Sequence, residues 1–256
     1  MTVAPDFRLR LGTGEADRWA AQRLRYDVFV EELGGTGPGV DHAARLEADR
    51  FDAHATHLLL EDHGAPDGPV IAATTRLMTS DQAALAGGFY SDGEYDLAPL
   101  VASGRTLTEL GRTCLDARYR GGDAMFHLWH GLARHLIETE TEVLFGVASF
   151  HGNDPQAVAE PLSLLHHRHL APVHLRPVAR ASGAARMDLV APGDLDRKAA
   201  LLATPALIKA YLRLGAMTGE GAFVDRDFNT VDVGLVVDLS QLSERQKAIY
   251  TKDLRT

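Results

Sequence analysis

The sequence has little cysteine, no long apolar run and no excess of positive charge. Its one cysteine, Cys114, cannot close an internal disulfide. No stretch approaches the ~20 apolar residues that span a bilayer, and the N-terminal MTVAPDFRLR lacks the apolar centre of a signal peptide. The formal charge of −9 leaves no global basic field to hold nucleic acid. These absences predict a cytoplasmic protein that meets any acidic partner through a local basic patch.

What the chain does have is typical of a globular protein. Its 256 residues are 45% hydrophobic and 24% charged, which is enough to bury a sizeable core. It contains no internal repeat, no low-complexity segment and no linker long enough to separate domains. The sequence therefore predicts a single domain over residues 1–256.

Hydrophobic spacing predicts a mixed α/β protein. Strands are expected over 7–11, 56–62, 69–79, 106–116 and 142–150, and helices over 14–33, 96–104 and 124–140. The hairpin 56–79 is antiparallel, and the strand–helix–strand unit over 106–150 is the crossover of a partly parallel sheet. Later segments are a helix over 154–170 that Pro161 should kink or interrupt, a helical stretch 205–217, strands at GAFVD and VDVGLVVD, and a closing helix in the tail SERQKAIYTKDL.

The stretch LTELGRTCLDARYRGGDAMFHLW, residues 107–129, combines an apolar strand with charge. Strand alternation places Glu109 and Arg112 on opposite faces, so at least one of the two charges meets a poorly solvated region. Glu109 is then either a structural partner of Arg112 or Arg76, or a catalytic group.

A glycine turn follows this strand. Gly121 and Gly122 precede a helix whose first N–H groups and positive dipole end suit an anion such as a phosphate. Arg118 and Arg120 just upstream add charge for a phosphate or an acidic protein. A purely structural turn explains the same residues.

A second charged segment, RLEADRFDAHATH over 45–57, crowds Glu47, Asp49 and Asp52 before a strand. It is either a solvated acidic loop or a cation site, which would bind an ammonium substrate or pair with Arg25 and Arg76.

Metal and nucleophile motifs are not found. The histidine pairs in HLWHGLARH and HHRH come without HExxH, and they are explained by polar helix faces. Cys114 is expected to be a small core residue, and GVASFHG does not form the G-x-S-x-G elbow of a nucleophilic serine.

Seven segments, in order from about residue 8 to 238, resemble the bacterial ornithine N-alpha-acyltransferases of ornithine-lipid synthesis. The segments are LRYDVFVEELGG, FDAHATHLLLED, GFYSDGEYDL, LTELGRTCLDARYR, LFGVASFHGNDP, PALIKAYLRLGA and FNTVDVGLVVD. The resemblance implies a GNAT-like fold with a mixed, mostly antiparallel sheet, a V-shaped splay, flanking helices and a C-terminal extension from about residue 151. It also implies kinship with the acyl-homoserine lactone synthases.

The signature of those synthases has matching residues here. They are Arg25, Phe29, Asp49, Asp52, Arg76, Glu109 and Arg112, whereas Gly111 stands where the synthases usually have serine. This departure favours the ornithine branch. Asp49 and Asp52 are expected either to order the fold around Arg25 and Arg76 or to contact the substrate.

The implied reaction moves a 3-hydroxyacyl group from acyl carrier protein to the α-amine of ornithine or a similar amino acid. No permanent cofactor or metal is expected. Glu109 is the proposed general base, with Arg112 as its ordering partner. The phosphopantetheine arm is expected at the turn of Arg118, Arg120, Gly121, Gly122 and Asp123, where the two arginines meet the acidic carrier. Peripheral contact with the inner membrane surface is compatible with this reaction.

Three alternatives remain at this point. A lactone-synthase-like enzyme or an acyl-CoA-dependent N-acetyltransferase would share the fold, although RYRGGDA only approximates the R/Q-x-x-G-x-G/A loop of the latter. A non-catalytic carrier-protein or lipid-binding module would leave Glu109 as a member of an ion pair.

Overall fold

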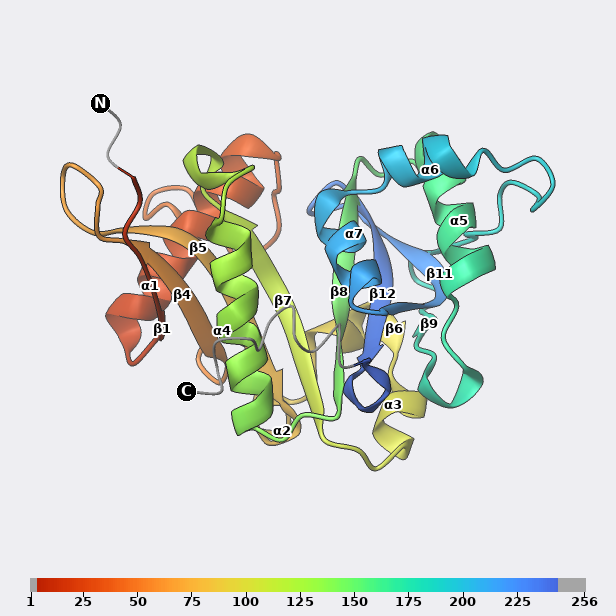
Figure 1. The fold of residues 1–256 in the computed structure, drawn as a ribbon, viewed down its shortest axis with the longest axis horizontal. Helices are drawn as coiled ribbons and strands as arrows, with labels where there is room; N and C mark the ends of the chain where they lie inside the picture. Colours follow the sequence, from red (N-terminus) through yellow and green to blue (C-terminus); the bar gives the residue numbers. More distant parts are fainter. Residues whose placement is uncertain (1–3, 244–256) are drawn as a thin grey trace. The chain divides into compact units, whose positions relative to one another are not determined.

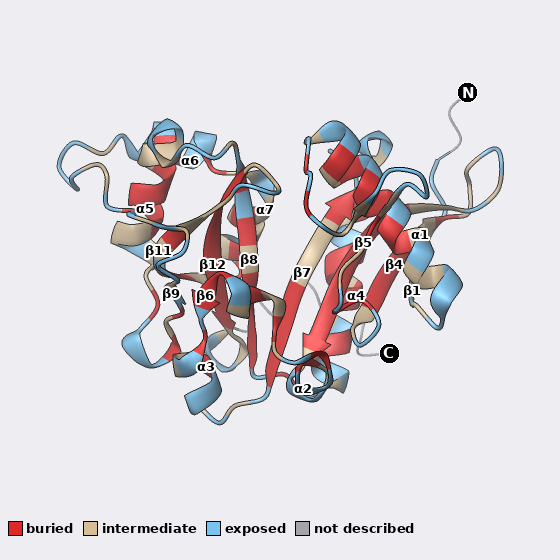
Figure 2. Cartoon of the chain, turned by 180° about the vertical axis from the view of Figure 1, so that it is seen from behind, coloured by how far each residue is buried: buried red, intermediate tan, exposed pale blue. Residues whose placement is uncertain are grey.

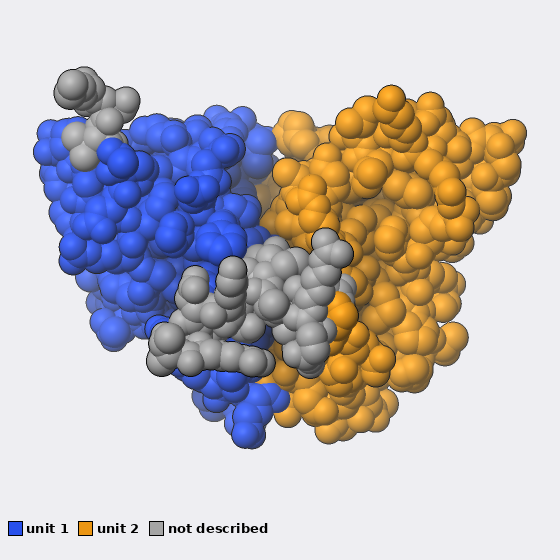
Figure 3. Space-filling model, viewed as in Figure 1, with its two compact units in different colours: residues 1–87, 110–140, 247–256 blue, residues 88–109, 141–246 orange. Residues whose placement is uncertain are grey.

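The computed structural model describes residues 4–243, and the chain divides into two compact units (Figure 3). Unit 1 comprises residues 1–87, 110–140 and 247–256, and unit 2 comprises 88–109 and 141–246. Strand β7 (Leu107–Leu115) belongs to both, because its first three residues lie in unit 2 and the rest in unit 1. The single domain expected over 1–256 stays a prediction.

The sheet of unit 1 contains β1 (Phe7–Leu11), β4 (Thr56–Asp62), β5 (Val70–Thr79) and β7, in that order (Figure 1). The predicted hairpin is confirmed, since β4 pairs with β5 in the antiparallel sense. Helix α4 (Ala124–Glu138) covers the face shown in Figure 1, and α1 (Glu15–Arg25) covers the face shown in Figure 2. Both faces of β4 are therefore buried, as its apolar run LLL requires.

The first predicted helix differs from the structure in its second half. Residues 15–25 are α-helical, but Tyr26–Glu32 form a π-helix, η1, before the chain turns at Gly34. The remaining elements of unit 1 are short: β2 (Val40–Asp41), β3 (Leu46–Glu47), α2 (Ser80–Ala86) and the 3₁₀ turn η3 (Ala117–Tyr119).

The sheet of unit 2 begins with β7 and continues through β8 (Val143–His151), β12 (Thr230–Asp238), β11 (Met217–Asp225), β9 (Val178–Ala179) and β6 (Tyr95–Asp96). Leu107–Glu109 of β7 pair in parallel with Val143–Phe145 of β8, as the crossover prediction requires. The short strand β10 (Ala184–Ala185) pairs with β11.

Helices α5 (Ala159–His169), α6 (Arg197–Ala203) and α7 (Ala206–Arg213) accompany this sheet, and α3 (Ala98–Ala102) lies near its β6 end. Pro161 does not interrupt α5, which corrects the expectation. It lies in the first helical turn, where its missing N–H has no intrahelical acceptor.

The described part of unit 2 also contains four 3₁₀ turns: η2 (Tyr90–Gly93), η4 (Pro155–Val158), η5 (Val173–Leu175) and η6 (Leu239–Gln241). The expected closing helix lies outside the described residues, apart from its first residue. Over residues 4–243, every helix is too short or too polar to cross a membrane.

Candidate functional site

Unit 1 contains a buried network, here called the arginine cluster, made of three arginines and three carboxylates. Its members are Arg25, Arg76, Arg112, Glu47, Asp49 and Asp52. Arg25 is 1% exposed and donates to the carboxylate of Glu47 at 2.5 Å, to the main-chain oxygen of Glu47 at 2.7 Å and to both oxygens of Asp52 at 2.7 and 2.8 Å. The three positive charges balance the three negative ones.

Arg76 and Arg112 extend this network. The Arg76 guanidinium donates to Asp49 at 2.6 Å and to Asp52 at 2.7 Å, and Arg112 lies 3.3 Å from both Glu47 and Asp49. Burial alone would raise the pKa of Asp52, yet the hydrogen bonds and charges of Arg25 and Arg76 hold that pKa well below its usual range. The geometry supports the expected ordering role, because each carboxylate already has guanidinium partners.

Local backbone conformations position two of the expected residues. Arg112 has a φ of +52°, a left-handed conformation that is uncommon for a non-glycine residue inside a strand. Phe29 lies in the π-helix and packs against a small core cluster of Leu24, Val28 and Cys114. Cys114 is buried, as predicted for a core residue.

Glu109 is 4% exposed and lies in the part of β7 that belongs to unit 2. Its two carboxylate oxygens accept the N–H groups of Tyr90 at 2.9 Å and Ser91 at 2.7 Å. Two such donors stabilise an ionised carboxylate and fix its direction. A carboxylate has about four lone-pair sites, so these two N–H groups use only part of the accepting capacity of Glu109.

The glycine turn has the features expected of an anion site and also local ion pairs. Gly121 has a φ of +78°, Gly122 follows it, and α4 begins after Asp123 without a side-chain cap. Arg118 is 65% exposed and pairs with Asp116 at 2.6 Å. Arg120 pairs with Glu32 at 2.5 Å and donates to the main-chain oxygen of Leu115. An acidic partner would have to exchange with these carboxylates.

The segment from Phe89 to Asp96 covers one face of the sheet in unit 2. Phe89 packs edge-on against Phe145 with ring centroids 4.9 Å apart. The Tyr95 hydroxyl donates to the main-chain oxygens of Gly221 and Asp232, both at 3.0 Å. Burial raises the pKa of Tyr95 far above its usual value, and the nearby carboxylates of Glu94 and Asp232 add to that increase.

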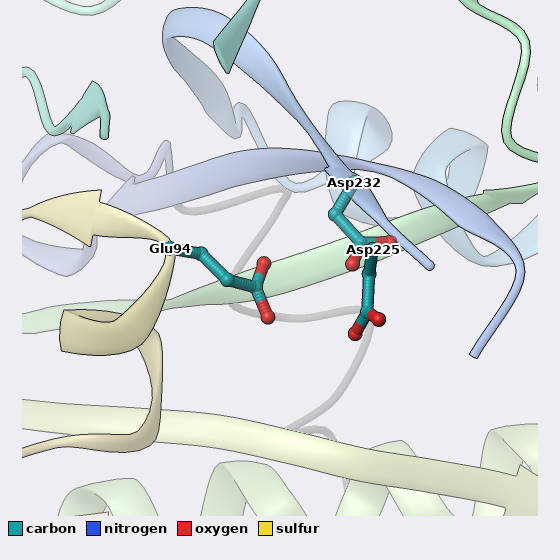
Figure 4. Close-up of side chains that lie close together, drawn as sticks. All are labelled: Glu94, Asp225 and Asp232. Atoms are coloured by element: carbon teal, nitrogen blue, oxygen red, sulfur yellow. The ribbon is translucent and has the colours of Figure 1, made fainter. Parts of the chain in front are cut away.

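The same face holds three carboxylates that sequence reasoning did not find. Oxygen atoms of Glu94, Asp225 and Asp232 all lie within 4.8 Å of one another (Figure 4). The residues come from three separate segments, so no local spacing pointed to them. Such a group attracts a cation, whereas the buried carboxylate of Glu109 can take a proton and the start of α4 suits an anion.

Comparison with known proteins defines the class. The family described as "Acetyltransferase (GNAT) domain" matches residues 24–130. An N-acyl amino acid synthase from uncultured soil microbes, FeeM, aligns with 93% of each chain at a TM-score of 0.53 and 15% identity. The acyl-homoserine lactone synthase LasI covers 97% of this chain and 96% of its own at a TM-score of 0.51 and 14% identity. The chain has a GNAT-like fold of the mixed α/β class.

Sequence relatives narrow the class. An L-ornithine N(alpha)-acyltransferase of Rhodobacter capsulatus is 55% identical over 98% of both chains. Another from Brucella abortus is 39% identical over 94% of this chain and 88% of that protein. The chain belongs to the L-ornithine N(alpha)-acyltransferase family.

Proposed function

We propose that the protein transfers a 3-hydroxyacyl group from acyl carrier protein to the α-amine of ornithine, giving a lyso-ornithine lipid. The observation that carries the proposal is the 55% identity, over 98% of both chains, to a protein with that named acyl-acceptor specificity. The buried, oriented carboxylate of Glu109 supplies a group that suits this chemistry.

In the proposed reaction the free α-amine attacks the thioester carbonyl directly. A C–N bond forms, the C–S bond breaks, and the carrier thiol leaves. Glu109, directly or through water, takes the proton that the amine loses, and the departing thiolate takes up a proton. Backbone N–H groups of β7 after residue 109 are the proposed donors to the oxyanion. Cys114 has no part in this route, which matches its burial.

The proposal also assigns the residues that bind the acyl donor. The phosphate of the phosphopantetheine arm is assigned to the turn at Gly121 and Gly122, where the N–H groups at the start of α4 have no side-chain cap. Arg118 and Arg120 are assigned to the acidic carrier surface, despite the total charge of −9.

One assay tests the reaction. Purified protein is incubated with 3-hydroxyacyl carrier protein, 3-hydroxyacyl-CoA or acetyl-CoA, together with ornithine, lysine, glutamine or glycine, and fragment mass spectra locate the acylated nitrogen. We expect the α-amide of ornithine from the carrier-bound donor. Acetyl transfer from CoA, or an amide on the side-chain nitrogen, would contradict the proposal.

The carrier surface has its own prediction. Replacing Arg118 and Arg120 together with alanine should raise the KM for the acyl carrier protein about 3- to 30-fold and leave the KM for ornithine unchanged, because a lost charge contact is typically worth about 1–2 kcal/mol. Arg186→Ala is the control, since Arg186 is also exposed and pairs with a carboxylate, that of Asp188. An unchanged KM for the carrier in the double variant would place the docking surface elsewhere.

A further inference from the structure

The three carboxylates of unit 2, here called the acidic triad, lie close together, with Glu94 and Asp232 buried and Asp225 partly buried. Glu94 follows turn η2, Asp225 ends β11 and Asp232 lies in β12, and Figure 4 shows their carboxylates directed toward a common space. Glu94 is 5% exposed and Asp232 is 3% exposed. Carboxylates gathered at this separation favour a cation among them.

A fourth polar group, the hydroxyl of Thr230, supports a binding site at the acidic triad. Thr230 is directly opposite Asp225 across β11 and β12, and it precedes Asp232 by two residues, so all three side chains emerge from one face of the sheet. Thr230 is 9% exposed, and its hydroxyl has no hydrogen-bond partner among residues 4–243. A buried hydroxyl without a partner in the chain is completed by a water or by a ligand.

Turn η2 connects the acidic triad to Glu109 within unit 2. Glu109 accepts the Ser91 N–H at 2.7 Å, and the Ser91 main-chain oxygen accepts the Glu94 N–H at 3.1 Å. The strand registers agree with this connection. Glu109 is opposite Phe145, Phe145 is opposite Val236, and Val236 is four residues from Asp232, so Glu109 and Asp232 lie on the same face.

We propose that the acidic triad and Thr230 bind the side-chain ammonium of a dibasic amino acid, which leaves its α-amine to react near Glu109. This inference rests on the proposed function and adds the group that selects the substrate. Ornithine carries a second ammonium, three methylenes from its α-carbon, which an aliphatic amino acid of equal length lacks. The arginine cluster of unit 1 has no surplus negative charge for such a group, since its charges balance.

The spacing suits an ammonium. Two acceptors about 2.8 Å from a tetrahedral nitrogen lie about 4.6 Å apart, which falls inside the limit of 4.8 Å observed for the triad. An ammonium also has three N–H donors to share among these oxygens.

Norvaline is the appropriate probe, because it is ornithine without the side-chain ammonium. In competition assays with 3-hydroxyacyl carrier protein, the wild-type protein should prefer ornithine. Asp232→Asn and Glu94→Gln should each lower the ratio of kcat/KM for ornithine over norvaline by about 10- to 150-fold, the usual range for a hydrogen bond to a charged group. Glu220→Gln, an exposed change on the same strand β11 as Asp225, should leave the ratio unchanged.

A binding measurement makes the test independent of turnover. Ornithine should raise the Tm of the wild-type protein more than norvaline does, and Asp232→Asn should abolish that difference. Wild-type protein that acylates or binds both amino acids equally overturns the inference without any variant. Variants that keep the ornithine preference, or that lose only the binding of Mg²⁺, Ca²⁺ or Zn²⁺ in calorimetry, also overturn it. Wild-type protein that prefers ornithine in binding but acylates nothing contradicts the proposed function and supports the ammonium site.

Discussion

At the scale of single residues, Asp52 shows how burial and charge compete. It accepts hydrogen bonds from Arg25, Arg76 and Gln22, all within 2.8 Å, although its side chain is only 2% exposed. Removing one member of a buried ion pair leaves an uncompensated charge, which costs about 3–5 kcal/mol. We expect Asp52→Asn to lower the free energy of unfolding in urea by that amount.

A matched control separates burial from the loss of a charge. Asp188 pairs with Arg186 through side chains that are 41% and 75% exposed. Asp188→Asn makes the same chemical change on the surface, where an ion pair contributes about 0–1 kcal/mol. Equal losses in the two variants would show that the arginine cluster has no special part in stability.

Glu109 has two candidate roles: a general base, or a structural acceptor, here called an anchor, for two main-chain N–H groups. As an anchor it fixes Tyr90 and Ser91; as a base it also takes a proton during turnover. Glu109→Ala should lower kcat by about 10²–10⁴-fold if the carboxylate is the base. Added formate should then restore part of kcat, because a small carboxylate can occupy the vacated space. Turnover that falls with stability and does not respond to formate would indicate an anchor alone.

At the scale of elements, the sequence predicted the long, periodic parts of the fold and missed the two-residue strands. The strands Thr56–Asp62 and Val70–Thr79 and the strand–helix–strand unit around α4 have clear spacing, and the structure confirms them. Strands β6, β9 and β10 contain two residues each, too few for a period to show. The apolar spacing predicts an α-helix where the structure has the π-helix, because both bury similar apolar residues.

The two charged sites differ in the same way. The members of the arginine cluster were identified because a family resemblance marked most of their positions, although their pairing came only from the structure. The acidic triad joins residues 94, 225 and 232, which tertiary pairing alone brings together. A local pattern cannot reveal such a site, since strand order and register decide which side chains share a face.

The β2–β3 hairpin provides a prediction at this scale. It pairs Val40 with Glu47, so it brings Glu47 to Arg25. A Cβ atom on Gly39 would lie 1.7 Å from the main-chain oxygen of Ala48, which belongs to the backbone and cannot rotate away. We expect Gly39→Ala to cost about 3 kcal/mol or more in urea unfolding.

Gly193→Ala is the control for this change, because its Cβ would meet nothing within 4 Å. It should alter stability by less than about 0.5 kcal/mol. An equally small effect of Gly39→Ala on stability would contradict this prediction. It would mean that the β2–β3 hairpin can move without disturbing Glu47, so that the hydrogen bonds of Arg25 do not depend on the hairpin.

At the scale of the whole molecule, buried titratable groups restrict the pH range of stability. Burial lowers the pKa of His57, His135 and His169 from their ordinary value of 6.5. The unfolded chain therefore binds more protons than the folded protein as the pH falls below about 6.5, and stability decreases in that direction. The lowered pKa of Asp52 acts in the same sense below about pH 4.

At alkaline pH the dependence of stability on pH has the opposite sign. Burial raises the pKa of Cys114 from 9.0 to about 12 and raises that of Tyr95 far above 10.0. The unfolded chain loses these protons first, so stability is complete below about pH 9 and decreases above it. The free energy of unfolding should therefore be greatest between about pH 7 and 9, with each titrating group contributing a slope of up to about 1.4 kcal/mol per pH unit.

Urea unfolding at constant ionic strength from pH 4 to 10 checks this prediction. Cys114→Ala removes the group that titrates first on the alkaline side, so its unfolding free energy should decrease less between pH 9 and 10 than that of the wild type, with the acid side unaltered. Stability that rose as the pH fell from 7 to 5 would mean that the buried histidines gain protons on folding. That outcome would require anionic partners close enough to their rings to outweigh the cost of burial.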